Sequence, residues 1–154
     1  MKTNIAVITF IILFFSCTNN IETRLPKPNP LPITGSWQLL TGTLIENGDT
    51  VVTDYSKKTS FIKIINDTHF AFLQHDLTKG KDSSALFVAG GGKYTIKDSL
   101  YTEHLEYCND RNWEGNDFTF TVTIKNDTLI QRGMEKIAAT EVNRLNIEKY
   151  LRIK

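Results

Sequence analysis

Glu103 is the acidic residue whose position in the sequence most suggests chemistry. It alternates with Tyr101, Leu105 and Tyr107, so the four side chains share one face if the segment is an extended strand. A carboxylate buried among such groups costs several kcal/mol unless it has a partner or takes up a proton. If this face is internal, we therefore expect Glu103 to be paired or protonated.

Lys63, two residues after Phe61, is the candidate partner of Glu103. An internal Lys63–Glu103 pair, with Tyr94 and Tyr101 beside it, would form the polar floor of a ligand cavity. If the faces point outward, no such pair forms. Alternation alone leaves both orientations open.

The other reactive side chains do not form a recognisable catalytic or metal-binding pattern. His69 and His75 are six residues apart, which on one strand separates them by about 20 Å, too far for one metal ion. His104 would have to approach from another strand. Glu103 and Glu106 point to opposite faces, which does not suit a glycosidase pair. The sequence predicts no enzyme, no metal site and no cofactor.

These candidate residues must be positioned by strands. In the segment 118–124, large apolar side chains alternate with threonines, which is typical of a strand with one buried face. Asn47-Gly48 predicts a tight hairpin turn because both residue types accept positive φ. The long segment 34–46 is expected to be the founding strand, with one face formed by Trp37, Leu39, Thr41, Thr43 and Ile45.

The later strands are expected to pair in sequence order. They cover residues 50–55, 60–65, 68–74, 85–88, 93–96, 100–107, 118–124 and 128–133. Gly90 to Gly92 interrupt the chain between two of them. A phosphate-binding loop would need a helix to follow, but the residues that follow are strand-like, so a bulge or bend is expected.

The C-terminal part is expected to close the sheet. Residues 138–146 predict a short helix or a turn, and residues 148–153 a final strand that returns beside the first. The predicted fold class is all-β, an antiparallel up-and-down β-barrel of about eight strands.

The N-terminus has the pattern of an export signal. Lys2 precedes an apolar run over residues 5–15, which is too short to cross a membrane as a helix. Ser16-Cys17 at its end looks like a bacterial lipobox, which implies cleavage before Cys17 and its acylation by chains such as palmitate. The alternative is a plain secretory signal with a chance cysteine.

The predicted domain organisation follows from these features. Residues 1–16 are the signal peptide, 17–33 the lipidated cysteine and a tether, and 34–154 the barrel. All four prolines lie in the tether and favour an extended spacer. If Cys17 is acylated, Cys108 is the remaining cysteine and is expected to be a structural, half-buried thiol. The net charge of +1 and the lack of a basic run make nucleic acid an unexpected partner.

Several short motifs, in this order, resemble the small lipocalin-like lipoproteins of the Bacteroidetes. They are the lipobox, the proline tether, Gly35-x-Trp37, Gly91-Gly92-Lys93-Tyr94, Tyr101-Thr102-Glu103 and a terminal strand with an arginine. The resemblance covers about residues 34–154. It implies a barrel of about eight strands with an internal pocket. It also implies that Trp37 packs at the closed end of the barrel under Arg152.

Three functions follow as hypotheses. The first is a membrane-anchored carrier of a small apolar or amphipathic ligand, held on the periplasmic face of the outer membrane, since no acidic run follows Cys17. The second is a structural or interaction lipoprotein of the envelope with a filled barrel. The third is a hydrolase that uses Glu103 and the histidines. The candidate cavity residues are Trp37, Phe61, Lys63, Phe70, Phe72, Tyr94, Tyr101, Glu103, Phe118 and Phe120.

Overall fold

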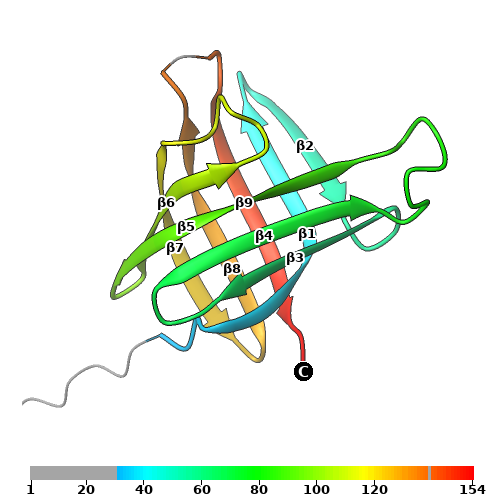
Figure 1. The fold of residues 1–154 in the computed structure, drawn as a ribbon. Helices are drawn as coiled ribbons and strands as arrows, with labels where there is room; N and C mark the ends of the chain where they lie inside the picture. The colour runs from blue at the N-terminus through cyan, green and yellow to red at the C-terminus, as the bar shows by residue number, and fades with distance from the viewer. Residues whose placement is uncertain (1–30, 139) are drawn as a thin grey trace, which may run out of the picture.

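The computed structural model describes residues 31–138 and 140–154. The expected signal peptide, Cys17 and most of the tether lie outside these residues. The described chain forms an antiparallel closed β-barrel of eight strands with one extra strand (Figure 1), which confirms the predicted fold class. Among the described residues, no helix has the length and apolar character needed to cross a membrane.

Nine strands follow one another along the chain. Their bounds are β1 (Gly35–Glu46), β2 (Asp49–Asp54), β3 (Thr59–Ile65), β4 (His69–Asp76), β5 (Phe87–Lys97), β6 (Leu100–Cys108), β7 (Asp117–Lys125), β8 (Thr128–Lys136) and β9 (Asn143–Arg152).

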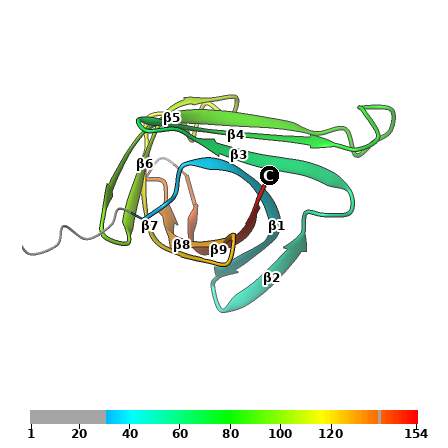
Figure 2. The same cartoon turned by 90° about the horizontal axis from the view of Figure 1, so that it is seen from below.

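Strand β1 holds the barrel together, as the length of segment 34–46 predicted. Nearly all of it pairs with β9, and its start, Gly35 to Gln38, pairs with β3. Its second half, Thr41 to Glu46, pairs with β2 on the same side as β3. The expectation that strands pair strictly in sequence order is therefore wrong at β3. Because β2 is short, it leaves the first half of β1 free, and β3 takes that place while β2 lies outside the ring (Figure 2).

Two irregularities change which side chains point inward. Between Leu39 and Thr41 the register of β1 against β9 shifts, so Gly42 and Leu44, rather than Thr43 and Ile45, line the interior. The face predicted for the second half of this strand is therefore wrong. One extra residue in a strand moves every later side chain to the opposite face.

The second irregularity lies at the glycine run. Strand β5 continues through the glycines, and a bulge occurs there as expected, but on the partner strand: Gly91 pairs with Tyr107 and Gly92 with Leu105, so Glu106 of β6 is the extra residue. Beyond this shift Tyr107 is 69% exposed and Cys108 is buried. The prediction that Tyr107 shares the face of Glu103 is wrong for this reason. A Cβ on Gly92 would overlap the carbonyl oxygen of His104, so only glycine fits there.

Strands β7 and β8 differ in what they bury. In β7, Phe118, Phe120 and Val122 are buried while the threonines between them are exposed, as predicted. In β8 the inward residues after Leu129 include the buried polar residues Gln131 and Glu135. The interior of the barrel is therefore apolar beside β7 and polar beside β8.

The turns follow the predicted chemistry, and before the last strand the structure has one of the two expected conformations. Asn47 and Gly48 have positive φ angles of 52° and 88° and join β1 to β2. Of the short helix or turn expected for residues 138–146, the structure has a turn, closed by the amide of Ile137, which donates to the carbonyl of Val142. Strand β9 begins at Asn143, earlier than expected, and pairs with β8 from there.

One end of the barrel is solid. Trp37 is fully buried, and its Nε1 donates to the carbonyl of Ile33 at 2.8 Å. Arg152 lies 4.0 Å from the centre of the Trp37 ring and donates to the carbonyls of Thr34 and Pro32. The segment before β1 thus crosses this end of the barrel (Figure 2). We call this end of the barrel the closed end. The Trp37–Arg152 pair lies where the resemblance places it.

Candidate functional site

The other half of the barrel holds a cavity of about 480 Å³. It lies at the end of the barrel that carries the β1–β2 turn, the β4–β5 and β6–β7 loops and the β8–β9 turn. We call this end the mouth. Its lining residues are Gly42, Leu44, Thr53, Tyr55, Phe61, Lys63, Phe72, Leu86, Phe87, Val88, Glu103, Leu105, Cys108, Asn109, Asp110, Trp113, Phe118, Phe120, Gln131, Glu135, Arg144, Asn146, Glu148 and Tyr150. The volume is in the usual range for a small-molecule site.

A buried ion pair forms the floor of this cavity. Lys63 from β3 donates to Oε1 of Glu103 from β6 at 2.7 Å and to Oε1 of Gln131 from β8 at 3.1 Å. Lys63 also lies 5.4 Å from the centre of the Tyr150 ring. Burial raises the pKa of Glu103, and the ammonium of Lys63 opposes that rise. Of the two orientations left open, the structure has the internal one.

One wall of the cavity is aromatic. Tyr55 and Phe61 meet edge to face with centroids 5.8 Å apart, and Phe61 stacks on Phe72 at 6.1 Å. On the adjoining side, Phe118 of β7 packs against Trp113 at 5.5 Å. Such rings offer a flat apolar surface to a ligand.

The opposite wall, on β8 and β9, is polar. Glu135 accepts from Nε of Arg144 at 2.8 Å and from Nδ2 of Asn146 at 2.7 Å. Glu148 accepts from the hydroxyl of Tyr150 at 2.7 Å. Burial and then the charge of Glu148 raise the pKa of Glu135. The cavity therefore has an aromatic side and a hydrogen-bonding side.

The loop at the mouth is held by an aspartate. Asp76, at the end of β4, accepts from the hydroxyl of Thr78 at 2.6 Å, the amide of Gly80 at 2.9 Å and the amide of Leu86 at 3.1 Å. These bonds hold the pKa of the Asp76 carboxyl well below its usual value. They fix the loop that carries Leu86 and Phe87 to the rim, and Phe87 is 62% exposed there.

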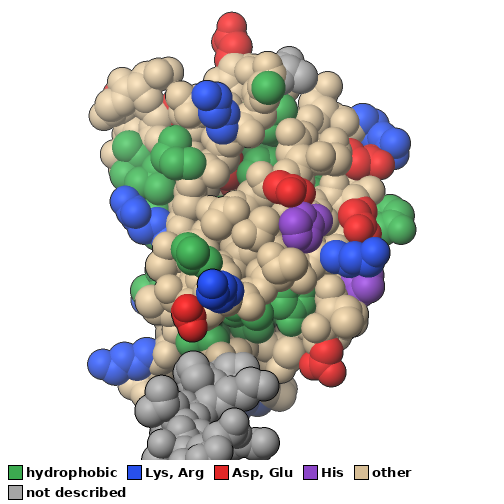
Figure 3. Space-filling view, turned by 90° about the vertical axis from the view of Figure 1, so that its left-hand side faces the viewer, with side chains coloured by type: hydrophobic (Ala, Val, Ile, Leu, Met, Phe, Trp, Pro, Cys, Tyr) green, Lys and Arg blue, Asp and Glu red, His purple; other side chains and the backbone are tan. Residues whose placement is uncertain are grey.

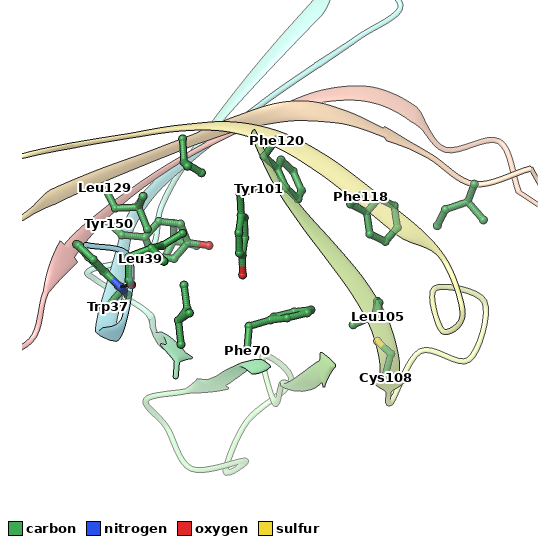
Figure 4. Packing of buried hydrophobic residues seen from close by; sticks show 14 residues of the cluster. Trp37, Leu39, Phe70, Tyr101, Leu105, Cys108, Phe118, Phe120, Leu129 and Tyr150 are labelled. Atoms are coloured by element: carbon green, nitrogen blue, oxygen red, sulfur yellow. Dashed lines mark hydrogen bonds between the residues drawn. The ribbon is translucent and has the colours of Figure 1, made fainter. Parts of the chain in front are cut away.

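The candidate residues from the sequence divide between the two halves of the barrel. Six line the cavity: Phe61, Lys63, Phe72, Glu103, Phe118 and Phe120. Trp37, Phe70, Tyr94 and Tyr101 do not, because they belong to the closed half. Figure 4 shows Phe70 and Tyr101 inside the barrel, with Trp37, Leu39, Leu129 and Tyr150 grouped beside them.

Tyr94 and Tyr101 are therefore misplaced in the expected cavity floor. The rings of Tyr94 and Tyr101 are 5.2 Å apart, and the hydroxyl of Tyr94 donates to the carbonyl of Asn66 near the β3–β4 turn. Tyr101 is fully buried, and its hydroxyl makes no hydrogen bond to the described residues. The two tyrosines therefore pack against each other in the closed half, and neither lines the cavity.

The polar wall is what sequence reasoning missed. In β8 and β9 the outward residues include Ile130, Met134 and Leu151, which are exposed, while polar residues point inward. This pattern is the reverse of the usual one for a strand on a water-soluble barrel. A signal was present, since the polar inward residues alternate regularly, but alternation does not say which face is internal.

The histidines lie apart from the cavity. Nδ1 of His104 is 2.8 Å from Oδ1 of Asp117, and neither His69, His75 nor His104 lines the cavity. In the part of the chain that the structure describes, no group of three or more His, Cys, Asp or Glu side chains is arranged to hold a metal ion. Cys108 is buried at the cavity wall, and burial raises the pKa of its thiol.

The outer surface over the side shown in Figure 3 carries acidic and basic side chains interspersed with small apolar areas. No large basic patch is present on that face.

No family model matches the sequence, and no curated protein matches it. A crystal structure of an uncharacterized protein from Bacteroides eggerthii is similar, with a TM-score of 0.43 and 15% sequence identity, over 76% of this chain and 98% of that chain.

Proposed function

We propose that this protein is a binding module that holds a small amphipathic molecule inside its barrel. The observation that supports this most directly is the cavity of about 480 Å³ with an aromatic wall, a polar wall and an ion pair at its floor. Apolar lining with a few convergent polar groups is typical of small-molecule sites. An amphipathic ligand fits this cavity better than a purely apolar one, because a purely apolar ligand would displace water from the polar wall without forming hydrogen bonds to it.

The alternative is a structural or interaction protein with a filled barrel. The closed half does have a solid core, in which Trp37, Tyr101 and Leu129 are fully buried. The mouth half differs, since its side chains leave a hollow that reaches exposed rim residues such as Phe87. This hollow favours binding over a purely structural role.

The proposal includes a lipid anchor at Cys17 on the periplasmic face of the outer membrane. It rests on the lipobox-like sequence and on the place where the chain enters the barrel. Ile33 is buried at the closed end beside Trp37. A tether that arrives there would leave the mouth at the far end of the barrel, open to a ligand that approaches from solution.

The test is a native mass spectrum of residues 18–154, produced in a bacterial host and purified without detergent. This range excludes Cys17, so no acyl chain contributes mass, and keeps the segment that packs under Arg152. We expect an added small-molecule mass that is lost on denaturation. As a control, Val88→Trp places an indole in the cavity and should abolish the added mass. A bare mass, together with no mass shift from a panel of amphiphiles, would contradict the proposal.

A further inference from the structure

The charges that line the cavity do not balance. Glu103, Glu135 and Glu148 are carboxylates, and Lys63 and Arg144 are the cationic side chains. Asp110 adds another carboxylate at the rim. The lining therefore carries an excess of negative charge, concentrated toward the mouth.

The ion pairs show which carboxylate is left over. Lys63 pairs with Glu103 at 2.7 Å, and Arg144 pairs with Glu135 at 2.8 Å. Glu148 makes no ion pair with any described residue, and its hydrogen bond comes from the neutral hydroxyl of Tyr150. The charge of Glu148 acts on its neighbours, because it adds to the effect of burial in raising the pKa values of Glu135 and Tyr55.

Aromatic rings lie next to this carboxylate. Glu148 is directly opposite Gly42 in the pairing of β9 with β1. The absence of a side chain at Gly42 leaves room for the ring of Tyr55, whose edge would lie 3.0 Å from a Cβ at that position. Phe61 meets Tyr55 at 5.8 Å. A carboxylate beside aromatic faces is an environment that favours an organic cation.

The floor has a polar group that faces the cavity. Because a lysine can only donate, Gln131 must turn its Oε1 toward Lys63, and its Nε2 then points elsewhere. Gln131 lines the cavity, so this amide donor is available to a polar group of a ligand.

We propose that the ligand is an amphipathic cation: a protonated amine on a flat apolar body, with the ammonium group beside Glu148 and Tyr55. This inference rests on the proposed binding function and names the class of its ligand. An anionic ligand would meet Glu148 and Asp110, while Lys63 and Arg144 are already bonded to carboxylates. A neutral ligand would leave the Glu148 charge uncompensated.

The test uses three probes with one apolar body and different head groups. They are 1-naphthylmethylamine, 1-naphthalenemethanol and 1-naphthoic acid, titrated calorimetrically at pH 7 into residues 18–154 after any bound molecule has been removed by unfolding and refolding. Both head groups can donate to the Glu148 carboxylate, but only the ammonium also carries a positive charge. We therefore expect the amine to bind about tenfold or more tightly than the alcohol. The acid should bind weakest.

Two variants localise the effect. Glu148→Gln should reduce the affinity of the amine about tenfold and leave that of the alcohol unchanged. Asp98→Asn is the matched control, because it removes an exposed acid in the β5–β6 turn at a positive φ of 56°, which asparagine also accepts. It should change neither affinity.

The outcomes separate this inference from the proposed function. If the alcohol or the acid binds as tightly as the amine, the cation preference is wrong while binding itself stands. If the amine is preferred but Glu148→Gln keeps that preference, the assigned position of the ammonium is wrong. If none of the probes binds, the inference is overturned, and the native mass spectrum then decides the binding function on its own.

Discussion

The closed end and the mouth of this barrel are made from the same strands but carry different kinds of interior. On β9, Arg152 belongs to the closed half, where it covers the ring of Trp37, and Tyr150 both packs in the core and lines the cavity floor. On the same strand, Arg144, Asn146 and Glu148 line the cavity. Alternation along a strand decides which side chains enter the barrel. The position along the strand decides whether they pack as core or remain as the wall of a cavity.

The largest expected loss of stability comes from a substitution at the closed end. Trp37→Ala removes a fully buried indole and its bond to Ile33, so it should lower the free energy of unfolding by about 4 kcal/mol. Trp113→Ala is the control, since Trp113 is half-buried beside the cavity and should cost less than half as much. Urea unfolding followed by circular dichroism measures both. Equal losses would show that the two ends do not differ in packing.

The next effect concerns the boundary between the two halves. Lys63→Met leaves Glu103 buried without its partner and should lower the free energy of unfolding at pH 7 by about 3 kcal/mol. Adding Glu103→Leu removes the stranded carboxylate and should recover most of that loss. A double variant as unstable as the single one would contradict a buried ion pair at the floor.

A smaller effect on stability is expected from a pair on one strand. Phe70 is 2% exposed in the closed half, and Phe72, two residues later on β4, lines the cavity. Phe72→Ala should cost about 1 kcal/mol, because the ring is only partly buried, but it should weaken binding of the naphthyl amine clearly. Phe70→Ala should show the reverse, with a larger loss of stability and unchanged affinity in the folded protein. Urea unfolding measures the two stabilities and calorimetry the two affinities. Equal effects of the two substitutions on stability and on affinity would contradict the division of β4 between the two halves.

The smallest effect is the pH dependence of the polar wall. The pKa of Glu135 is raised above its ordinary value of 4.5, first by burial and then by Glu148. The folded protein therefore takes up this proton at a higher pH than the unfolded chain does, so the wild type gains stability as pH falls from 7 toward 4.5. Glu135→Gln should lack this gain. Unfolding free energies measured at pH 7, 6 and 5 should thus diverge between the two proteins.

Asp98→Asn serves as the control for that series. It removes one exposed carboxyl in the β5–β6 turn, outside the polar wall, and so shows what the loss of a surface charge alone does to the series. A difference between Glu135→Gln and the wild type that stays constant with pH would show that Glu135 titrates alike in the folded and unfolded states, and that the polar wall is not buried.

Much of the fold could be predicted because local signals agree with the final structure. Phe118, Phe120 and Val122 alternate with threonines, and the turn residues Asn47 and Gly48 adopt the positive φ angles their types favour. Pairing between strands distant in sequence has no such local signal. The position of β3 beside the first half of β1 follows from the shortness of β2, which sequence patterns do not define sharply.

The candidate site was predicted in part for a similar reason. Lys63 and Glu103 stand out because a charge between apolar neighbours is unusual, and the structure brings them together. Glu135 and Glu148 have other polar residues beside them in the sequence, so a charge at these positions is not unusual and does not indicate a site. The bulge in β1, which turns Gly42 inward and makes room for Tyr55, depends on a single unpaired residue and is not visible in the alternation.

The most direct test of a solid end and a hollow, ligand-binding end uses the two tryptophans of the chain. Residues 18–154 labelled with 5-fluorotryptophan should give one ¹⁹F signal from Trp37 at the closed end and one from Trp113 at the cavity, assigned with Trp113→Phe. Titration with 1-naphthylmethylamine should move the Trp113 signal in a saturable way and leave the Trp37 signal unchanged. If both signals stay fixed, or if only the Trp37 signal moves, the account of a binding cavity at the mouth is wrong.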